Sequence, residues 1–331
     1  MASAKLLRQL IKTGSERNHE AFKRISEQLI REERAKNHHL LANDLEKILY
    51  GRSRSAMPLH SELSERLPKD KERNLPLLQI KEPVRRLEDV VLSDENASLL
   101  EELLQEHHRS EILKSYGLYP IDKLLFCGPP GCGKTLTAEV LASELGLPLA
   151  IVRVDSVISS FLGETAANLR QVFDFISTVP MVVLFDEFDS LAKERADEAE
   201  HGELKRVVNA FLQMLDAYEG KSILVAATNH EAILDSAVWR RFDEVLVFES
   251  PNLEQLRRLL SIKLRGLRRE FKIEDSRIAG LFKGMSHADV ERVLRRAAKD
   301  MVLSGKEFLS ERHLQTAICR EDTRRARTQR G

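Results

Sequence analysis

Long hydrophobic runs and cysteines are both scarce in this chain of 331 residues. The longest apolar stretches, such as residues 181–185 and 223–227, have the length of strands. A membrane-spanning helix needs about 20 apolar residues, so the sequence predicts no such helix. Three cysteines cannot build a disulfide framework, and so sparse a set is typical of a reducing compartment. We therefore expect a cytoplasmic protein, bacterial in type, without a membrane partner.

An excess of charge of either sign is also missing. Lysine plus arginine and aspartate plus glutamate number 52 each, so the formal net charge at pH 7 is zero. This balance disfavours nucleic acid as a partner, because a protein that coats nucleic acid carries an excess of basic residues. Residues 1–15 leave one alternative open. Lys5, Arg8 and Lys12 stand there without an acid, as in a presequence for the mitochondrial matrix; the other interpretation is an ordinary first helix.

The first 83 residues read as a small helical region followed by a linker. Leucine and isoleucine recur at helical spacing three times within residues 1–50, which predicts three helices. A unit of this size buries little surface by itself, so we expect it to dock on a partner or a substrate. Residues 51–83 hold four of the ten prolines and many charges, which is typical of a linker.

Strand-like and helix-like segments alternate from residue 84 to residue 249. The helical patterns separate β-rich runs at 124–127, 149–154, 181–185, 223–227 and 245–248. This alternation predicts an α/β fold with a parallel five-stranded sheet and helices on both faces. Only helical patterns occur in residues 250–320, which we expect to form a small all-helical lid. Residues 321–331 read as a frayed basic tail.

Residues 128–135, Gly-Pro-Pro-Gly-Cys-Gly-Lys-Thr, match the P-loop pattern of glycines, lysine and hydroxyl at fixed offsets. The glycines let the backbone wrap round phosphates, and the helix that follows adds its positive end. We expect Lys134 to neutralise phosphate charge and Thr135 to ligate Mg²⁺. The predicted ATP-binding residues of this segment are Gly128, Pro129, Pro130, Gly131, Cys132, Gly133, Lys134, Thr135 and Leu136. A thiol so near a helix N-terminus, that of Cys132, is expected to have thiolate character and to react with maleimides.

Two acids, Asp186 and Glu187, follow the apolar run at 181–185. Placing two carboxylates at the edge of a sheet costs free energy, so a pair at this position indicates a function. Because they stand about fifty residues after a P-loop, we predict that Asp186 holds the Mg²⁺ shell and that Glu187 polarises the attacking water.

With these motifs the chain resembles the AAA+ ATPases, in the group that contains katanin, spastin and the membrane-anchored AAA proteases, over about residues 85–305. The resemblance includes residues 227–229, Ala-Thr-Asn, and the adjacent arginines of residues 234–243. It implies that Asn229 helps to orient the water. It also implies a homo-oligomer, expected to be a hexamer, in which Arg240 and Arg241 act as arginine fingers in the active site of a neighbouring subunit.

The same resemblance implies two further segments of the nucleotide site. Asp89 and Val90 lie where the backbone of the family meets the adenine ring. Residues 284–289, Gly-Met-Ser-His-Ala-Asp, resemble the family's lid motif, with Ala288 in the place of an arginine that other AAA+ groups use to sense the nucleotide. His287 replaces a usual glycine, and it either contacts adenine or ribose or caps a helix.

Residues 161–163, Phe-Leu-Gly, match the pattern of a pore loop that grips an extended polypeptide in this family. Phe161 offers an apolar grip that tolerates any substrate sequence, Leu162 is the apolar residue of the pattern, and Gly163 lets the loop move. Ser160 replaces the usual lysine. The alternative is that Phe161 belongs to the core.

These features predict an ATPase that uses ATP and Mg²⁺ to unfold, translocate or remodel a protein substrate. No His-Glu-x-x-His zinc motif occurs in the 331 residues, so a protease served by this motor is expected to be separately encoded. Two alternatives are open: an ATP-controlled switch or scaffold that does not thread its substrate, and a nucleic-acid-linked motor.

Overall fold

The computed structural model describes residues 66–70, 74–158, 162–188, 201–230 and 236–328, together with residues 22, 24–29, 32 and 63. The chain divides into two units, Met1–Glu65 and Arg66–Gly331. In the first unit, residues 24–29 are helical, and the hydroxyl of Ser26 donates to the carbonyl oxygen of Phe22 at 2.8 Å. The apolar pattern of Phe22, Ile25, Leu29 and Ile30 predicts this helix, the second of the three in residues 1–50; the first and third lie outside the described residues.

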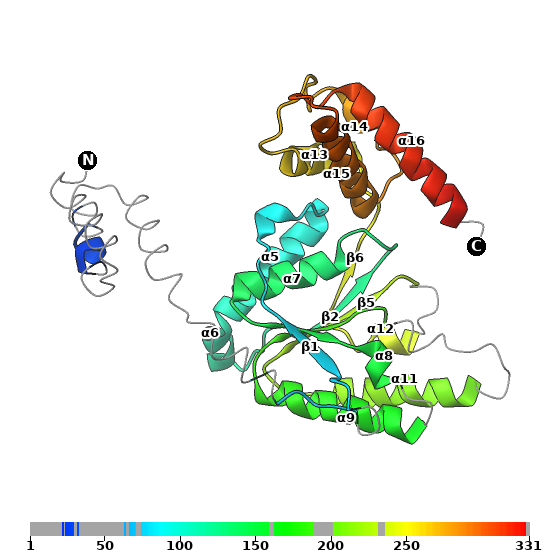
Figure 1. Ribbon diagram of the computed structural model, residues 1–331. Helices are drawn as coiled ribbons and strands as arrows, with labels where there is room; N and C mark the ends of the chain where they lie inside the picture. Colours follow the sequence, from blue (N-terminus) through cyan, green and yellow to red (C-terminus); the bar gives the residue numbers. More distant parts are fainter. Residues whose placement is uncertain are drawn as a thin grey trace. The chain divides into compact units, whose positions relative to one another are not determined.

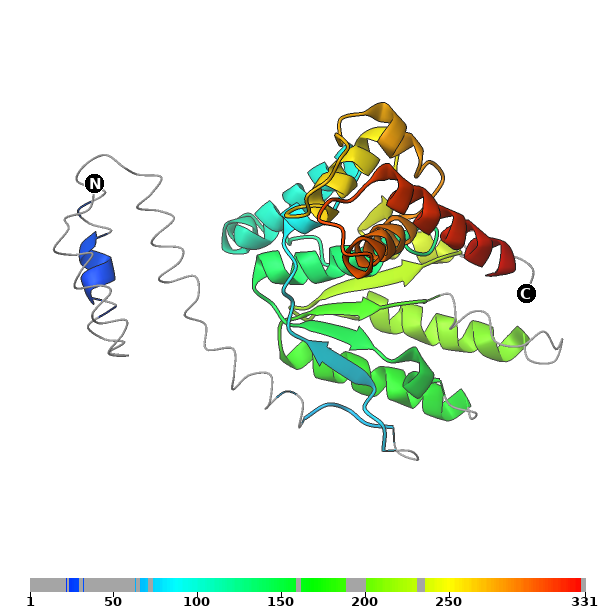
Figure 2. The same cartoon turned by 45° about the horizontal axis from the view of Figure 1, so that its top comes forward.

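A six-stranded sheet forms the centre of the second unit (Figures 1 and 2). In the spatial order β1-β3-β4-β5-β2-β6, its strands are β1 (Leu78–Lys81), β3 (Leu149–Val152), β4 (Val182–Phe185), β5 (Ile223–Thr228), β2 (Lys123–Cys127) and β6 (Glu244–Val247). The five strands predicted from the sequence are present and parallel to one another, which confirms the predicted α/β class. The sixth strand, β1, pairs with β3 in the antiparallel direction.

Strand β1 corrects the prediction of a linker over residues 51–83. Leu77 and Leu78 are fully buried in the core, and buried and exposed residues alternate along the strand. The Nζ of Lys81 also lies 2.6 Å from the carboxylate of Glu139 on α7 (Lys134–Leu145). Prolines and charges suggested a linker, but two leucines gain more from burial at the sheet edge than from exposure to water. From residue 66 onward, the described residues of this range therefore belong to the second unit.

Helices cover both faces of the sheet (Figure 2). Helices α5 (Asp94–His108) and α7 pack on one face, and α9 (Leu162–Thr178) and α11 (His201–Asp216) pack on the other. Strand β2 shows why: Leu124 and Phe126 join the core beneath α5 and α7, while Leu125 and Cys127 join the core beneath α9 and α11. A parallel strand that is buried on both faces needs apolar residues at successive positions, as β2 has.

The shorter elements connect these layers. They are η1 (Leu87–Asp89), α6 (Ser110–Ser115), α8 (Val154–Val157) and α12 (Ser236–Trp239). Within the described part of the chain, no helix has the length and apolar character needed to cross a membrane.

Four helices follow the sheet and form the lid: α13 (Leu253–Lys263), α14 (Ser276–Gly280), α15 (His287–Leu303) and α16 (Glu311–Thr328). They have a hydrophobic core of their own, to which Val91 also contributes. The prediction of a frayed tail from residue 321 is wrong, because α16 continues to Thr328. Its first predicted tail residue, Glu321, is fully buried and pairs with arginines, so the helix is held where the sequence suggested fraying.

Candidate functional site

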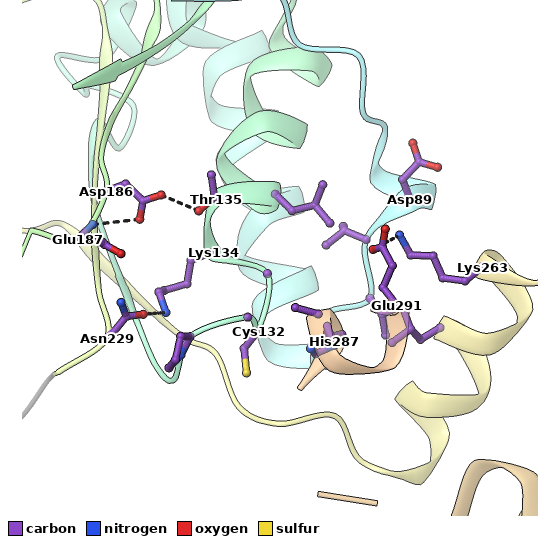
Figure 3. A pocket seen from close by; sticks show the side chains of 18 residues that line it. Asp89, Cys132, Lys134, Thr135, Asp186, Glu187, Asn229, Lys263, His287 and Glu291 are labelled. Atoms are coloured by element: carbon purple, nitrogen blue, oxygen red, sulfur yellow. Dashed lines mark hydrogen bonds and ion pairs between the residues drawn. The ribbon is translucent and has the colours of Figure 1, made fainter. Parts of the chain in front are cut away.

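Three predicted motifs meet at one edge of the sheet. Strand β5 lies between β4 and β2, and all three run in the same direction. The P-loop follows β2, Asp186 and Glu187 follow β4, and Asn229 follows β5. Parallel strands end at the same edge, so segments far apart in the sequence face one cavity there (Figure 3).

Two glycines of the loop occupy positions where no side chain fits. Gly128 has a φ of 137°, and a Cβ atom there would lie 2.0 Å from the carbonyl oxygen of Phe248. Gly131 has a φ of 78°, and its Cβ would lie 2.9 Å from the hydroxyl of Ser286. Both conformations are left-handed or nearly so and are unfavourable for other residues. The first glycine brings the loop against the chain after β6, and the second lets the lid approach the loop. The backbone N–H of Ala288 then donates to the carbonyl of Gly131 at 3.0 Å.

Lys134 is held over the loop by oxygen atoms. Its ammonium group is buried and donates to the carbonyls of Gly128 (2.5 Å) and Pro129 (3.0 Å) and to the side-chain oxygen of Asn229 (2.8 Å). These contacts hold the ammonium group against the loop, and Lys134 lines the cavity beside it. The amide of Asn229 thereby joins the end of β5 to the phosphate loop.

The residues after β4 provide oxygen ligands. The hydroxyl of Thr135 donates to the carboxylate of Asp186 at 2.8 Å (Figure 3). A hydroxyl beside a carboxylate is the type of donor set that Mg²⁺ prefers. Glu187 has a φ of 52°, which is uncommon for a residue other than glycine, and its side chain is exposed. Its backbone N–H donates to the carboxylate of Asp186 at 3.0 Å. The glycine cradle, the lysine and the oxygen pair together fit a nucleotide phosphate with Mg²⁺.

A cavity of about 390 Å³ contains these groups. It is lined by residues 130–136 of the loop, by Asp186, Glu187 and Asn229, by residues 89–91, and by Leu259, Lys263, His287, Ala288 and Glu291 of the lid. Gly128 and Pro129 do not line it, but their carbonyls hold Lys134. The size lies in the range of small-ligand sites.

The sequence analysis missed the residues that α13 and α15 place at the lid side of the cavity. Leu259 and Lys263 stand on one face of α13, four residues apart, and Glu291 stands four residues after His287 on α15. The ammonium of Lys263 lies 2.8 Å from the carboxylate of Glu291. Helical spacing from His287 indicates Glu291, but no local pattern indicates that α13 faces α15 at this point.

Helix capping is not the role of His287. The hydroxyl of Ser286 accepts a hydrogen bond from the backbone N–H of Asp289 at 3.2 Å, so Ser286 is the N-cap of α15. His287 lines the cavity, and among the described residues its two buried ring nitrogens have no hydrogen-bond partner of normal geometry. Burial and the charge of Lys263 lower the pKa of His287, against an opposing effect of the Val91 backbone. The imidazole is therefore neutral at pH 7, with one donor and one acceptor.

The prediction of a reactive thiolate at Cys132 is wrong. The residue is only 2% exposed, and burial raises the pKa of its thiol, although Lys134 and Ser250 oppose this shift. In Figure 3 the sulfur points away from Lys134 and Thr135. The side chain packs in the core beneath α5 and α7, and the favourable helix end does not compensate for the loss of water.

The predicted arginine fingers do not line this cavity, and the predicted pore loop is described only in part. Arg240 is exposed, and the Nε of Arg241 lies 2.8 Å from the carboxylate of Asp216; neither lines the cavity. Phe161 lies outside the described residues. Leu162 and Gly163 begin α9, so their backbone is helical where a loop was expected. Both roles remain predictions.

Known proteins resemble this chain over much of its length. Residues 124–250 match the AAA family, the ATPase family associated with various cellular activities. The AAA family ATPase y4kL of Sinorhizobium fredii is 40% identical over 326 residues, which are 98% of this chain and 97% of that protein. A 26S proteasome regulatory subunit homologue of Methanothermobacter marburgensis is 30% identical over 60% of this chain and 55% of its own length. The ATP-dependent zinc metalloprotease FtsH 1 of Thermomicrobium roseum is 29% identical over 72% of this chain and 38% of its own length.

These matches differ in the share of each relative that they cover. The chain spans about half of the proteasome-related protein and less of the metalloprotease, so those two matches concern a shared portion. The match to y4kL covers nearly the whole of both proteins. Residues 124–250, which match the AAA family, include the P-loop, both acids and Asn229. This chain belongs to the AAA family of ATPases.

Proposed function

We propose that this AAA ATPase couples ATP hydrolysis to the unfolding, translocation or remodelling of a protein substrate, and that it works as a homo-oligomeric ring, expected to be a hexamer. The observation that carries the proposal is the meeting of Lys134, Asp186 and Asn229 at one cavity that the lid closes from the other side. The names of two relatives, a proteasome regulatory subunit homologue and an ATP-dependent metalloprotease, support a protein substrate. The proposal includes the narrower kinship with katanin, spastin and the membrane-anchored AAA proteases.

Bound ATP would supply the phosphoanhydride bond, and Mg²⁺ would spread the charge of its phosphates. Lys134 would bind phosphate, and Thr135 and Asp186, whose side chains are hydrogen-bonded to each other, would hold the metal. Glu187, exposed on its turn, would accept the proton of the attacking water as that water bonds to the terminal phosphorus and ADP leaves, and Asn229 would orient the water.

Residues 89–90 and the first turn of α15 would hold the base of the nucleotide. Asp89, Val90, His287 and Ala288 all line the cavity. A neutral imidazole both donates and accepts, which suits the edge of a purine or the hydroxyls of a ribose.

The ring completes this site and engages the substrate. Arg240 and Arg241 lie outside the cavity of their own subunit, as residues that serve a neighbour must. Phe161, Leu162 and Gly163 grip the polypeptide in the central channel. A separately encoded protease is the proposed recipient of the unfolded substrate, and the cytoplasm is the proposed location.

Two substitutions test the chemistry. Lys134→Ala is expected to lose ATP binding, while Glu187→Gln is expected to bind ATP and to stop releasing phosphate. Nucleotide affinity, phosphate release and the mass of the assembly with ATP are measured for both. Normal turnover by Glu187→Gln contradicts the assignment of the base.

A third substitution tests the mechanical role. Glu187→Gln, loaded with ATP, is used to capture substrate by cross-linking. Phe161→Ala is then expected to hydrolyse ATP at the normal rate and to leave that substrate folded. If Phe161→Ala processes the substrate at the wild-type rate, an ATP-controlled switch replaces the threading motor as the better description.

A further inference from the structure

The lid contains a buried carboxylate that the ATP chemistry does not use. Glu321 on α16 is 0% exposed. One of its oxygens accepts from the Nε of Arg292 on α15 at 3.1 Å and from the Nε of Arg324 at 2.8 Å. The other oxygen has no hydrogen bond among the described residues, and the guanidinium of Arg296 lies 3.9 Å away. A buried charge is costly unless it is paired, so this acid depends on the arginines around it.

A second carboxylate, Asp289, shares these arginines. It is 8% exposed and pairs directly with Arg292. Arg324 and Arg325 of α16 lie 3.7 Å and 3.8 Å from it, and Arg325 also donates to the carbonyl of Gly284 at 2.9 Å. The arginines therefore join an acid of α16 to an acid of α15, two helices that pack side by side (Figure 1).

Asp289 is in turn joined to the phosphate loop. Its carboxylate accepts from the hydroxyl of Ser286 at 2.9 Å and from the backbone N–H of the same residue at 3.2 Å. Burial alone favours the neutral acid, but these hydrogen bonds and the charges of Arg292 and Arg325 lower the pKa of Asp289. Ala288, the residue before Asp289 in this turn, donates its N–H to the carbonyl of Gly131 at 3.0 Å. The first turn of α15 is thus held by the arginines on one side and by the loop on the other.

We propose that Glu321 is a positioning residue for nucleotide binding, because through Arg292, Arg324 and Asp289 it fixes the first turn of α15 against the phosphate loop. The docking of α16 and the binding of nucleotide then stabilise each other. Such coupling is reciprocal by thermodynamic necessity, so nucleotide must also hold α16 in place. The inference rests on nucleotide binding at the P-loop, which the wild-type protein tests separately.

The decisive variant is Glu321→Gln, which keeps the shape of the side chain and removes its charge. Asp322→Asn is the matched control, because Asp322 is the next residue of α16, carries the same charge and is exposed. The dissociation constant of ADP and the hydrogen exchange of residues 311–328 with and without ADP are measured on the full chain. We expect Glu321→Gln to weaken ADP binding about fivefold or more, the low end of typical coupling, and Asp322→Asn to match the wild type.

Hydrogen exchange distinguishes a positioning role from a mere loss of local packing, because only a positioning role makes the protection of α16 depend on ADP. In the wild type, ADP is expected to slow the exchange of α16, although no residue of this helix lines the cavity. In Glu321→Gln this protection by ADP is expected to disappear. Should Glu321→Gln fail to fold, Arg324→Met takes its place. It removes the hydrogen bond to Glu321 and the contact with Asp289, and it leaves Glu321 paired with Arg292.

A folded Glu321→Gln with the wild-type ADP affinity overturns the proposal, as does an α16 whose exchange ADP does not change in the wild type. The same holds for Arg324→Met if it is the variant used. A wild-type chain that binds no ADP contradicts the nucleotide site itself, which is a different failure.

Discussion

Gly128→Ala tests how closely packing sets the path of the phosphate loop. A Cβ at this position would lie 2.0 Å from the carbonyl oxygen of Phe248, a backbone atom. Phe248 cannot move away easily. It is 3% exposed, its N–H donates to the carbonyl of Cys127 at 2.7 Å, and its ring lies 5.2 Å from that of Phe126. The loop must therefore shift, or the strand beside it must.

The cost of Gly128→Ala in the free energy of unfolding has two parts. A left-handed backbone costs a residue with a side chain about 1–2 kcal/mol. Forcing an extra carbon into a packed region adds about 1–3 kcal/mol. Gly117→Ala isolates the first part, because Gly117 has a φ of 73° and nothing lies within 4 Å of the Cβ that alanine adds. The difference between the two variants is the steric contribution.

Thermal unfolding of both variants measures this difference. For a domain of this size, 1 kcal/mol corresponds to roughly 2–4 °C in Tm. We expect a decrease of roughly 10 °C for Gly128→Ala and of roughly 4 °C for Gly117→Ala. Gly128→Ala is also expected to lose ATP binding, because Lys134 donates to the carbonyl of Gly128 itself. Equal Tm values for the two variants would refute the reasoning.

Three further predictions follow from charges and burial. Burial raises the pKa of Asp122 to about 6, above its value of about 3.9 in an unfolded chain. The native state then binds the extra proton between these values, so the free energy of unfolding should fall as pH rises through this window, and Asp122→Asn should flatten the fall in denaturant titrations. Buried Cys132 should react with a maleimide far more slowly than exposed Cys319, as peptide mapping would show; comparable rates would contradict its burial. Asp216→Asn should keep normal ATP hydrolysis, since an exposed ion pair contributes only about 0–1 kcal/mol to stability. Arg241→Ala should lose ATP hydrolysis and regain part of it when mixed with a P-loop variant. If both variants lose the same share of ATP hydrolysis, the ion pair has only a structural role.

Some features of this protein follow from local spacing. The strands, the helices on both faces and the helical lid depend on the period of apolar residues, and that period is visible in any window of the sequence. The P-loop is equally local, because its glycines, Lys134 and Thr135 act through one turn and the helix after it. Asp186 and Glu187 follow from their place after an apolar strand, whereas Asn229 was indicated by the resemblance to the AAA+ ATPases; parallel strands bring all three to one edge.

Local patterns were misleading where burial decided the outcome. Prolines and charges indicated a linker around β1, yet Leu77 and Leu78 are buried there. A helix N-terminus indicated a thiolate at Cys132, yet its side chain lies in the core. Repeated arginines indicated a frayed tail, yet Glu321 holds α16 against α15.

The sequence by itself determined the α/β fold, the P-loop and the acids that accompany it. Only the tertiary structure decided that α13 faces α15, where Lys263 meets Glu291, and that the arginines of α16 reach Asp289. The reason is physical. Periodicity specifies which face of an element is buried, but the partner of a buried charge depends on how distant segments pack, and a buried acid such as Glu321 is stable only once those segments have met.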